Sequence, residues 1–172
     1  MTAGNLKFKI NNQKGAAAVE FALVLPLLLI FIFGVIEFGL LLYNKQVITN
    51  AVREGCRTGV VMRDSSLRVS AADFLAEDNL IKNVTVGWAT NNLVTFGGDI
   101  FDAGDVTVYG VDTALTPHVS HTPRVLADFQ FRDNLIVEAT FSYNFLFLSI
   151  NIGSFNGIGP IPLSSVSIMK ME

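Results

Sequence analysis

The chain has 172 residues, is 51% hydrophobic and carries a formal charge of −3. This acidity argues against a nucleic-acid partner, because the basic footprint of such proteins is missing. A single cysteine, Cys56, excludes an intramolecular disulfide, so a secreted domain must rely on core packing or on partners.

The first fifteen residues are polar and basic and contain no acid. Positive charge favours the cytoplasmic side of a membrane, so we expect the N-terminus inside and the bulk of the chain outside. The downstream flank holds only Lys45, which supports this orientation.

A long uncharged run follows. The run is Phe21–Ile36, with the sequence FALVLPLLLIFIFGVI. It is extended by Ala16–Val19 before it and by Phe38–Leu42 after it. A helix that crosses a hydrocarbon core needs roughly 20 apolar residues, so we predict a membrane span. The alternative interpretation is a secretory signal peptide that is cleaved off, but its cleavage site requires small residues after the apolar run. Here Ala16–Ala18 stand before the run, on the wrong side.

Two carboxylates and a proline interrupt this run. Glu20 and Glu37 stand near its two ends, and a carboxylate at membrane depth costs at least a few kcal/mol unless it is paired or near the headgroups. For Glu37 the alternatives are the outer interface or a basic group on a partner helix. Pro26 predicts a kink, which membrane helices tolerate.

We expect the helix to continue from Tyr43 to about Met62 as the spine of a domain. Its polar row recurs every four residues, at Lys45, Thr49, Arg53 and Arg57. Gly55 and Gly59 lie on the opposite face and suggest close approach of another element, most simply the domain's own sheet. Cys56 lies on the same face, and we expect it to be buried as a small hydrophobic residue.

The rest of the chain predicts one further helix and about four strands. The helix is Leu67–Asn79, and the strands are Asn83–Thr90, Asp105–Val111, Asn134–Phe145 and Leu163–Met171. The connections are a turn-rich hairpin at Asn91–Gly104 and loops at Thr113–Arg124 and Ile150–Pro162. The fold class is therefore α+β, with a long N-terminal membrane-spanning helix that continues as the spine of a small domain with an antiparallel sheet.

The connecting segments hold weak candidate sites. The aspartates Asp99, Asp102 and Asp105 could offer oxygen ligands to calcium, or simply cap a polar turn. His118 and His121 lack a nearby acid or cysteine, so solvated histidines are the favoured interpretation. We expect no metal site and no cofactor. Phe145–Leu148 with Ile150 forms either a contact surface, toward a partner subunit or the outer leaflet, or a plug of the core.

The N-terminal pattern resembles a type IV prepilin signal: a basic leader ends at Gly15, a small residue follows, and Glu20 stands five places after the glycine. A finer resemblance is to the TadE-like family, the minor pseudopilins of the Tad/Flp (tight adherence) pilus. The segments that carry it are GAAAVEFALVLPLLL from Gly15, Ile36–Gly39, Ala51–Gly55 and the C-terminal Leu163–Glu172.

This resemblance implies cleavage between Gly15 and Ala16 by a prepilin peptidase. The chain then divides into a leader (1–15), a transmembrane and assembly helix (16–43) and an extracytoplasmic pilin-like domain (44–172). The new amine at Ala16 lies one helical turn from Glu20 and could neutralise it, in the same or a neighbouring subunit. The alternative is that Glu20 only favours the positive end of the helix dipole.

The function implied is that of a structural subunit, not an enzyme, in a bacterial inner membrane and in the fibre or at its base or tip. Its partners would be the peptidase, other Tad minor pseudopilins, the major pilin, the assembly platform and the lipid bilayer. Two alternatives stay open: a single-pass envelope protein with a ligand- or ion-binding outer domain, and a type II secretion pseudopilin.

Overall fold

The computed structural model describes residues 13–61, 71–96, 100–111, 134–147 and 158–170. Two compact units can be distinguished, Met1–Ile36 and Glu37–Glu172. The predicted loop 113–124 and both histidines lie outside the described residues, as does most of the predicted loop 150–162.

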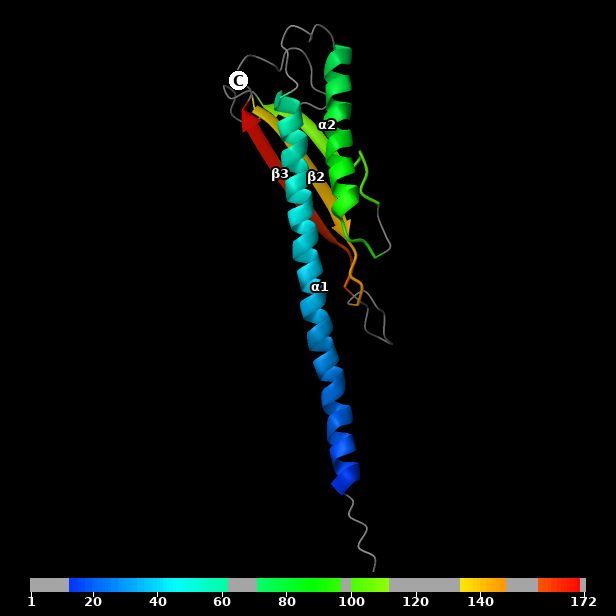
Figure 1. Cartoon of the computed structure of the whole chain (residues 1–172). Helices are drawn as coiled ribbons and strands as arrows, with labels where there is room; N and C mark the ends of the chain where they lie inside the picture. Colours follow the sequence, from blue (N-terminus) through cyan, green and yellow to red (C-terminus); the bar gives the residue numbers. More distant parts are fainter. Residues whose placement is uncertain (1–12, 62–70, 97–99, 112–133, 148–157, 171–172) are drawn as a thin grey trace, which may run out of the picture. The chain divides into compact units, whose positions relative to one another are not determined.

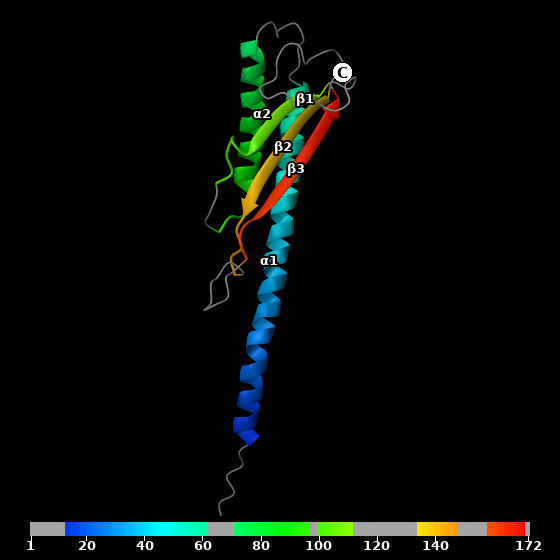
Figure 2. The ribbon, with the colours of Figure 1, turned by 180° about the vertical axis from the view of Figure 1, so that it is seen from behind.

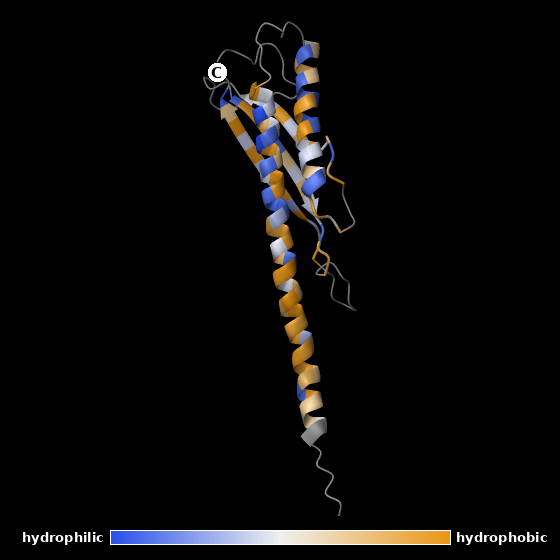
Figure 3. Cartoon of the chain, in the orientation of Figure 1, coloured by the Kyte–Doolittle hydropathy of each residue, from blue (hydrophilic) through white to orange (hydrophobic). Residues whose placement is uncertain are grey.

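Helix α1, Gln13–Val61, is a single α-helix that includes Pro26 (Figure 1). The long helix predicted from the sequence is therefore confirmed. Within the first unit, no described side chain from Gly15 to Ile36 is buried. The hydrophobic colour of this stretch is nearly continuous in Figure 3. Helix α1 is also the one described helix that is long and apolar enough to cross a membrane.

The second unit contains a three-stranded antiparallel sheet in the order β1-β2-β3 (Figure 2). The strands are β1, Val106–Val111, β2, Asn134–Tyr143, and β3, Ile161–Lys170. The central strand pairs Ile136 with Tyr109 on one side and with Ile168 on the other. One face of strand β2 is buried as predicted, with Leu135, Val137, Ala139, Phe141 and Tyr143 in the core. Ile136, predicted on the other face, is buried as well.

The prediction of a strand at Asn83–Thr90 is wrong, because these residues lie inside helix α2, Ala71–Asn92. Buried side chains along α2 recur three or four residues apart, at Phe74, Asp78, Ile81, Thr85 and Ala89. This is the period of one helical face, and it overrides the two-residue alternation of Val84, Val86 and Trp88. The sheet has three strands rather than four, and the segment 91–104 joins a helix to a strand rather than closing a hairpin.

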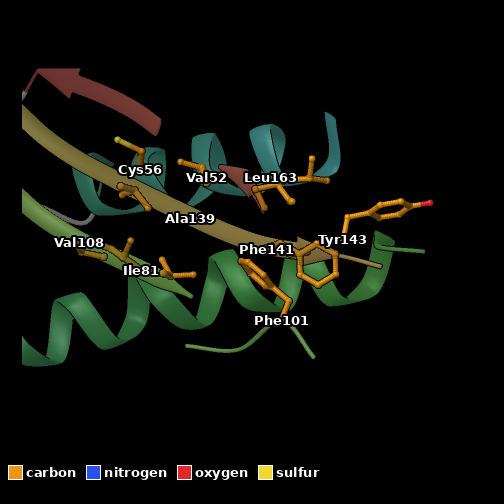
Figure 4. Close-up of a cluster of buried hydrophobic side chains, with 14 of the residues drawn as sticks. Val52, Cys56, Ile81, Phe101, Val108, Ala139, Phe141, Tyr143 and Leu163 are labelled. Atoms are coloured by element: carbon orange, nitrogen blue, oxygen red, sulfur yellow. The ribbon is translucent and has the colours of Figure 1, made fainter. Parts of the chain in front are cut away.

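Both helices cover the same face of the sheet, since they lie in front of it in Figure 1 and behind it in Figure 2. The core lies between these two layers. Figure 4 shows its side chains converging from α1 (Val52, Cys56), α2 (Ile81) and the sheet (Val108, Ala139, Phe141). The C-terminal half of α1 is therefore the spine of the domain, as the sequence predicted.

Two glycines of α1 set how closely α2 approaches it. A Cβ at Gly55 would overlap Oγ1 of Thr85 on α2. A Cβ at Gly59 would lie 2.6 Å from Cδ1 of Ile81 and 2.5 Å from Cδ2 of Leu135 on β2. The close approach predicted for these glycines is thus to the second helix at Gly55, and to both helix and sheet at Gly59.

We predict that Gly55→Ala destabilises the domain by about 1–3 kcal/mol, because the added methyl overpacks the contact between the helices. Gly87→Ala on α2 is the matched control, since a methyl added there would meet nothing within 4 Å. It should be neutral or stabilising by up to about 1 kcal/mol. Urea unfolding of the full chain in mild detergent, followed by Trp88 fluorescence, measures both. Equal free energies of unfolding for the two variants would contradict the close contact.

Candidate assembly site on helix α1

Glu37 is the first residue of the second unit, and its side chain is fully buried. Three donors surround its carboxylate. The Tyr143 hydroxyl and the Leu146 backbone N–H donate to Oε1 at 3.0 and 2.7 Å, and the Phe147 backbone N–H donates to Oε2 at 2.9 Å. We call this group the Glu37 cradle.

The cradle forms where strand β2 ends. Beyond Tyr143 the chain leaves the sheet, so the N–H groups of Leu146 and Phe147 need acceptors outside the strand ladder. The carboxylate supplies two oxygens for them, and hydrogen bonds to an ionised group are the stronger kind. A buried carboxylate with three donors is stable where an isolated one would not be. The cradle therefore fixes the end of β2 onto α1.

The environment of the Glu37 cradle shifts the pKa of Tyr143. Burial, then its hydrogen bond to Glu37 and the negative charge there, raise the Tyr143 pKa from 10.0 to about 12. The folded domain thus holds this proton more tightly than the unfolded chain does. Its contribution to stability is complete below the unfolded pKa of 10.0 and is lost as the pH rises through about 12. Across the physiological range Tyr143 therefore stays a neutral donor to the carboxylate.

A second buried polar residue lies two helical turns further along α1. The Asn44 side chain is fully buried and forms both hydrogen bonds with Val94, in the segment that follows α2. Its amide N–H donates to the Val94 carbonyl at 2.7 Å, and its oxygen accepts the Val94 N–H at 3.0 Å. Residues seven apart share one face of a helix, so Glu37 and Asn44 line the same side of α1.

Neighbouring side chains add to this fastening. The Tyr43 hydroxyl donates to the Asn92 carbonyl at 3.2 Å, at the end of α2. Lys45 Nζ donates to the Ser164 carbonyl of β3, and Ser165 Oγ donates to Thr49 Oγ1 at 3.3 Å. The stretch of α1 from Glu37 to Thr49 thus holds segments that follow or form α2, β2 and β3.

The other predicted assembly and processing residues lie in the first unit. Gly15, Ala16, Glu20 and Pro26 are all exposed on α1. They belong to the first unit, whereas Glu37 belongs to the second. The two alternatives stated for Glu37 looked for its partners in the headgroups or on another helix, whereas the described partners belong to its own domain.

Two of the weak candidates from the connecting segments, Asp102 and Asp105, lie among the described residues. Asp102 Oδ1 accepts the Gly104 N–H at 2.6 Å, and Asp105 Oδ2 accepts the Asp102 N–H at 2.9 Å. These aspartates cap their own turn, and Asp99 lies outside the described residues. Among the described residues no three potential ligands gather as a metal site. Cys56 is buried, and burial raises the pKa of its thiol.

Sequence reasoning singled out Glu37 but missed every partner in its cradle, and it missed Asn44 altogether. A tyrosine at the end of the longest strand and an irregular segment after it carry no local pattern that points to a distant carboxylate. The spacing of Glu37 and Asn44 by seven residues, on the face that also holds Ile48 and Val52, was the available signal.

Residues 15–57 match the family model of TadE-like proteins. The TadE-like resemblance is therefore confirmed over a segment that begins at Gly15 and includes Glu20, Glu37 and Asn44. A search of curated proteins found no match, and neither did a search of solved structures. The matched segment lies wholly within α1.

We predict that Glu37→Gln lowers the free energy of unfolding by about 1–3 kcal/mol, because an amide N–H2 then faces backbone donors and one acceptor is lost. The same change should move the Tyr143 pKa down from about 12, since two of its three causes involve Glu37. Urea unfolding and a tyrosinate absorbance titration measure the two effects.

The control for this prediction is Glu54→Gln, on the same helix. Glu54 pairs with Arg57 at 3.7 Å on the exposed surface, and such pairs contribute at most about 1 kcal/mol. A Glu37→Gln protein that unfolds and titrates like this control would show that the cradle contributes nothing to the domain.

Proposed function

We propose that the protein is a minor pseudopilin of a Tad/Flp pilus, a structural subunit that packs with other pilin subunits through its N-terminal helix. The observation that carries this proposal is the TadE-like match over residues 15–57, on a helix whose apolar stretch is nowhere buried from Gly15 to Ile36. The family is a structural one, so an enzymatic role is not proposed.

The apolar stretch of α1 needs an apolar environment that the described chain does not supply. Its side chains include Leu23, Leu27, Ile30 and Phe31, each at least two-thirds exposed. At about 25 cal/mol per Å² of apolar surface, leaving such a helix in water is costly. A lipid bilayer before assembly and a bundle of similar helices after it would both remove this surface from water.

Glu20 gives such a bundle its register. Cleavage after Gly15 would free an amine at Ala16, four residues and about one helical turn from the Glu20 carboxylate. In an apolar bundle this acid is stable only with a cation. The position of a subunit in the bundle is therefore fixed by the ion pair between Glu20 and the Ala16 amine of the same or a neighbouring subunit. Loss of one partner of a buried pair costs about 3–5 kcal/mol.

Pro26 and Glu37 serve the same helix in different ways. Pro26 leaves the carbonyl of Ala22 without its usual N–H donor, so the helix is easiest to bend there as it leaves lipid. Glu37 fixes the domain to the helix through the cradle, which makes the domain follow the helix when it moves. Both are therefore assembly residues in this proposal.

The setting follows from the membrane span and the basic leader. We place the protein in a bacterial inner membrane with its N-terminus in the cytoplasm and residues 44–172 outside, in or at the base or tip of the pilus. A prepilin peptidase would process it, and the other minor pseudopilins, the major pilin and the assembly platform would be its partners. The TadE-like match favours this system over type II secretion.

We predict that Gly15→Ala blocks maturation, because a Cβ at this position would hinder the peptidase at the bond to Ala16. The mass and N-terminal sequence of the protein, purified from membranes with and without a prepilin peptidase, measure cleavage. Gly34→Ala, also in the apolar part of α1, should still lose its leader. A Gly15→Ala chain that begins at Ala16 would refute the prepilin interpretation.

We predict that Glu20→Ala leaves cleavage largely intact but impairs assembly, since the amine at Ala16 loses its partner. Piliation and co-purification of partner subunits should both fall at least tenfold, which corresponds to about 1.4 kcal/mol. Glu54→Ala removes an exposed carboxylate from the same helix and should change neither. Unchanged assembly of the Glu20 variant would leave only a minor role at the membrane interface.

A further inference from the structure

Between its two carboxylates, Glu20 and Glu37, the uncharged run of α1 is short for a membrane span. Phe21–Ile36 is sixteen residues, about 24 Å of helix, whereas a hydrocarbon core is about 30 Å thick. Continuing to Leu42 gives 22 residues and about 33 Å, which is sufficient. The obstacle to this longer span is the charge of Glu37.

The Glu37 cradle lowers this obstacle. The carboxylate is fully buried and accepts hydrogen bonds from the Tyr143 hydroxyl and two backbone N–H groups, so protein donors solvate its charge in place of water. The residues around it on α1 are apolar and face outward: Phe38 is 61% exposed and Leu42 52% exposed. The apolar surface of α1 thus passes Glu37 without interruption and ends at Tyr43 and Lys45.

The cradle also holds an apolar, irregular segment at the level of Glu37. The side chains of Leu146 and Phe147 are only partly buried, and both of their backbone N–H groups are already bonded to the carboxylate. Irregular backbone is tolerated at membrane depth only where its polar groups are satisfied within the protein. This segment meets that condition for its donors.

We propose that the outer boundary of the membrane lies at Tyr43–Lys45 and that Leu146 and Phe147 enter the lipid beside the helix. Leu146 and Phe147 then form a second membrane contact of the domain. Glu37 lies at the depth of the outer leaflet, where the donors of the Glu37 cradle surround its carboxylate. Tyr43 suits the headgroup level, where amphipathic aromatic rings are enriched. Lys45, with its ammonium on the Ser164 carbonyl, is the first cation after the span.

This proposal rests on the membrane-spanning part of the proposed function and is independent of cleavage and assembly. It is tested with the full chain in vesicles of phosphatidylethanolamine and phosphatidylglycerol with bromine on the acyl chains. In a Trp88→Phe background, single tryptophans are placed by Phe147→Trp, by Phe31→Trp within the uncharged run and by Val166→Trp on the exposed face of β3. Far-UV circular dichroism and protection of the buried Cys56 from a thiol reagent establish that each variant is folded.

We expect bromine to quench the tryptophans at 31 and 147 by at least twofold. The tryptophan at 166, and Trp88 in the unsubstituted chain, should be quenched only by aqueous acrylamide. Acrylamide quenching at 147 with lipid quenching at 31 would overturn this inference and leave the span intact. Quenching at 147 by neither reagent would overturn it in favour of a second protein copy. Absence of lipid quenching at 31 would overturn the span itself, and with it the proposed function.

Discussion

The buried carboxylate of Glu37 ties the end of strand β2 to the long helix. Glu37 accepts hydrogen bonds from the end of strand β2 and from the irregular segment behind it, and it does so from the point on α1 where the domain begins. Without these donors an acid at this position would be costly, and without the acid the two backbone N–H groups would lack acceptors. The sheet and the helix are therefore interdependent: each satisfies polar groups that the other would leave buried and unbonded.

Helix α1 presents two different surfaces along one continuous element. Up to Ile36 its side chains are unburied and almost wholly apolar, and a bilayer or a bundle of similar helices would suit them equally. From Glu37 onward one face becomes a protein core, with Asn44 bonded to the segment after α2 and Gly55 and Gly59 in close contact with α2 and β2. The residues from Glu37 to Tyr43 have both kinds of surface. Their outward face is apolar and exposed, and their inward face packs against the domain.

Helix α2 shows where local pattern misleads. Between Asn83 and Thr90 the alternation of Val84, Val86 and Trp88 with smaller residues has the period of a strand, and β-branched residues favour one. The segment is helical because Ile81, Thr85 and Ala89, spaced by four, are buried on one face of α2. The missing side chain of Gly55 on α1 admits Thr85 at this face. Packing against a neighbouring element outweighs propensities that span only about 1 kcal/mol.

The sequence alone determined the long helix, its apolar stretch, the leader-like N-terminus with Gly15 and Glu20, and two-residue alternation in β2, because these are periodic or short-range patterns. It also marked Glu37 as an acid that needed an explanation. Only the tertiary structure decided what surrounds that acid, since Tyr143, Leu146 and Phe147 are more than a hundred residues away along the chain. The same holds for the helical state of 83–90 and for the three-stranded sheet. In each case the deciding free energy comes from contacts between distant segments, and no local pattern in the sequence reports these contacts.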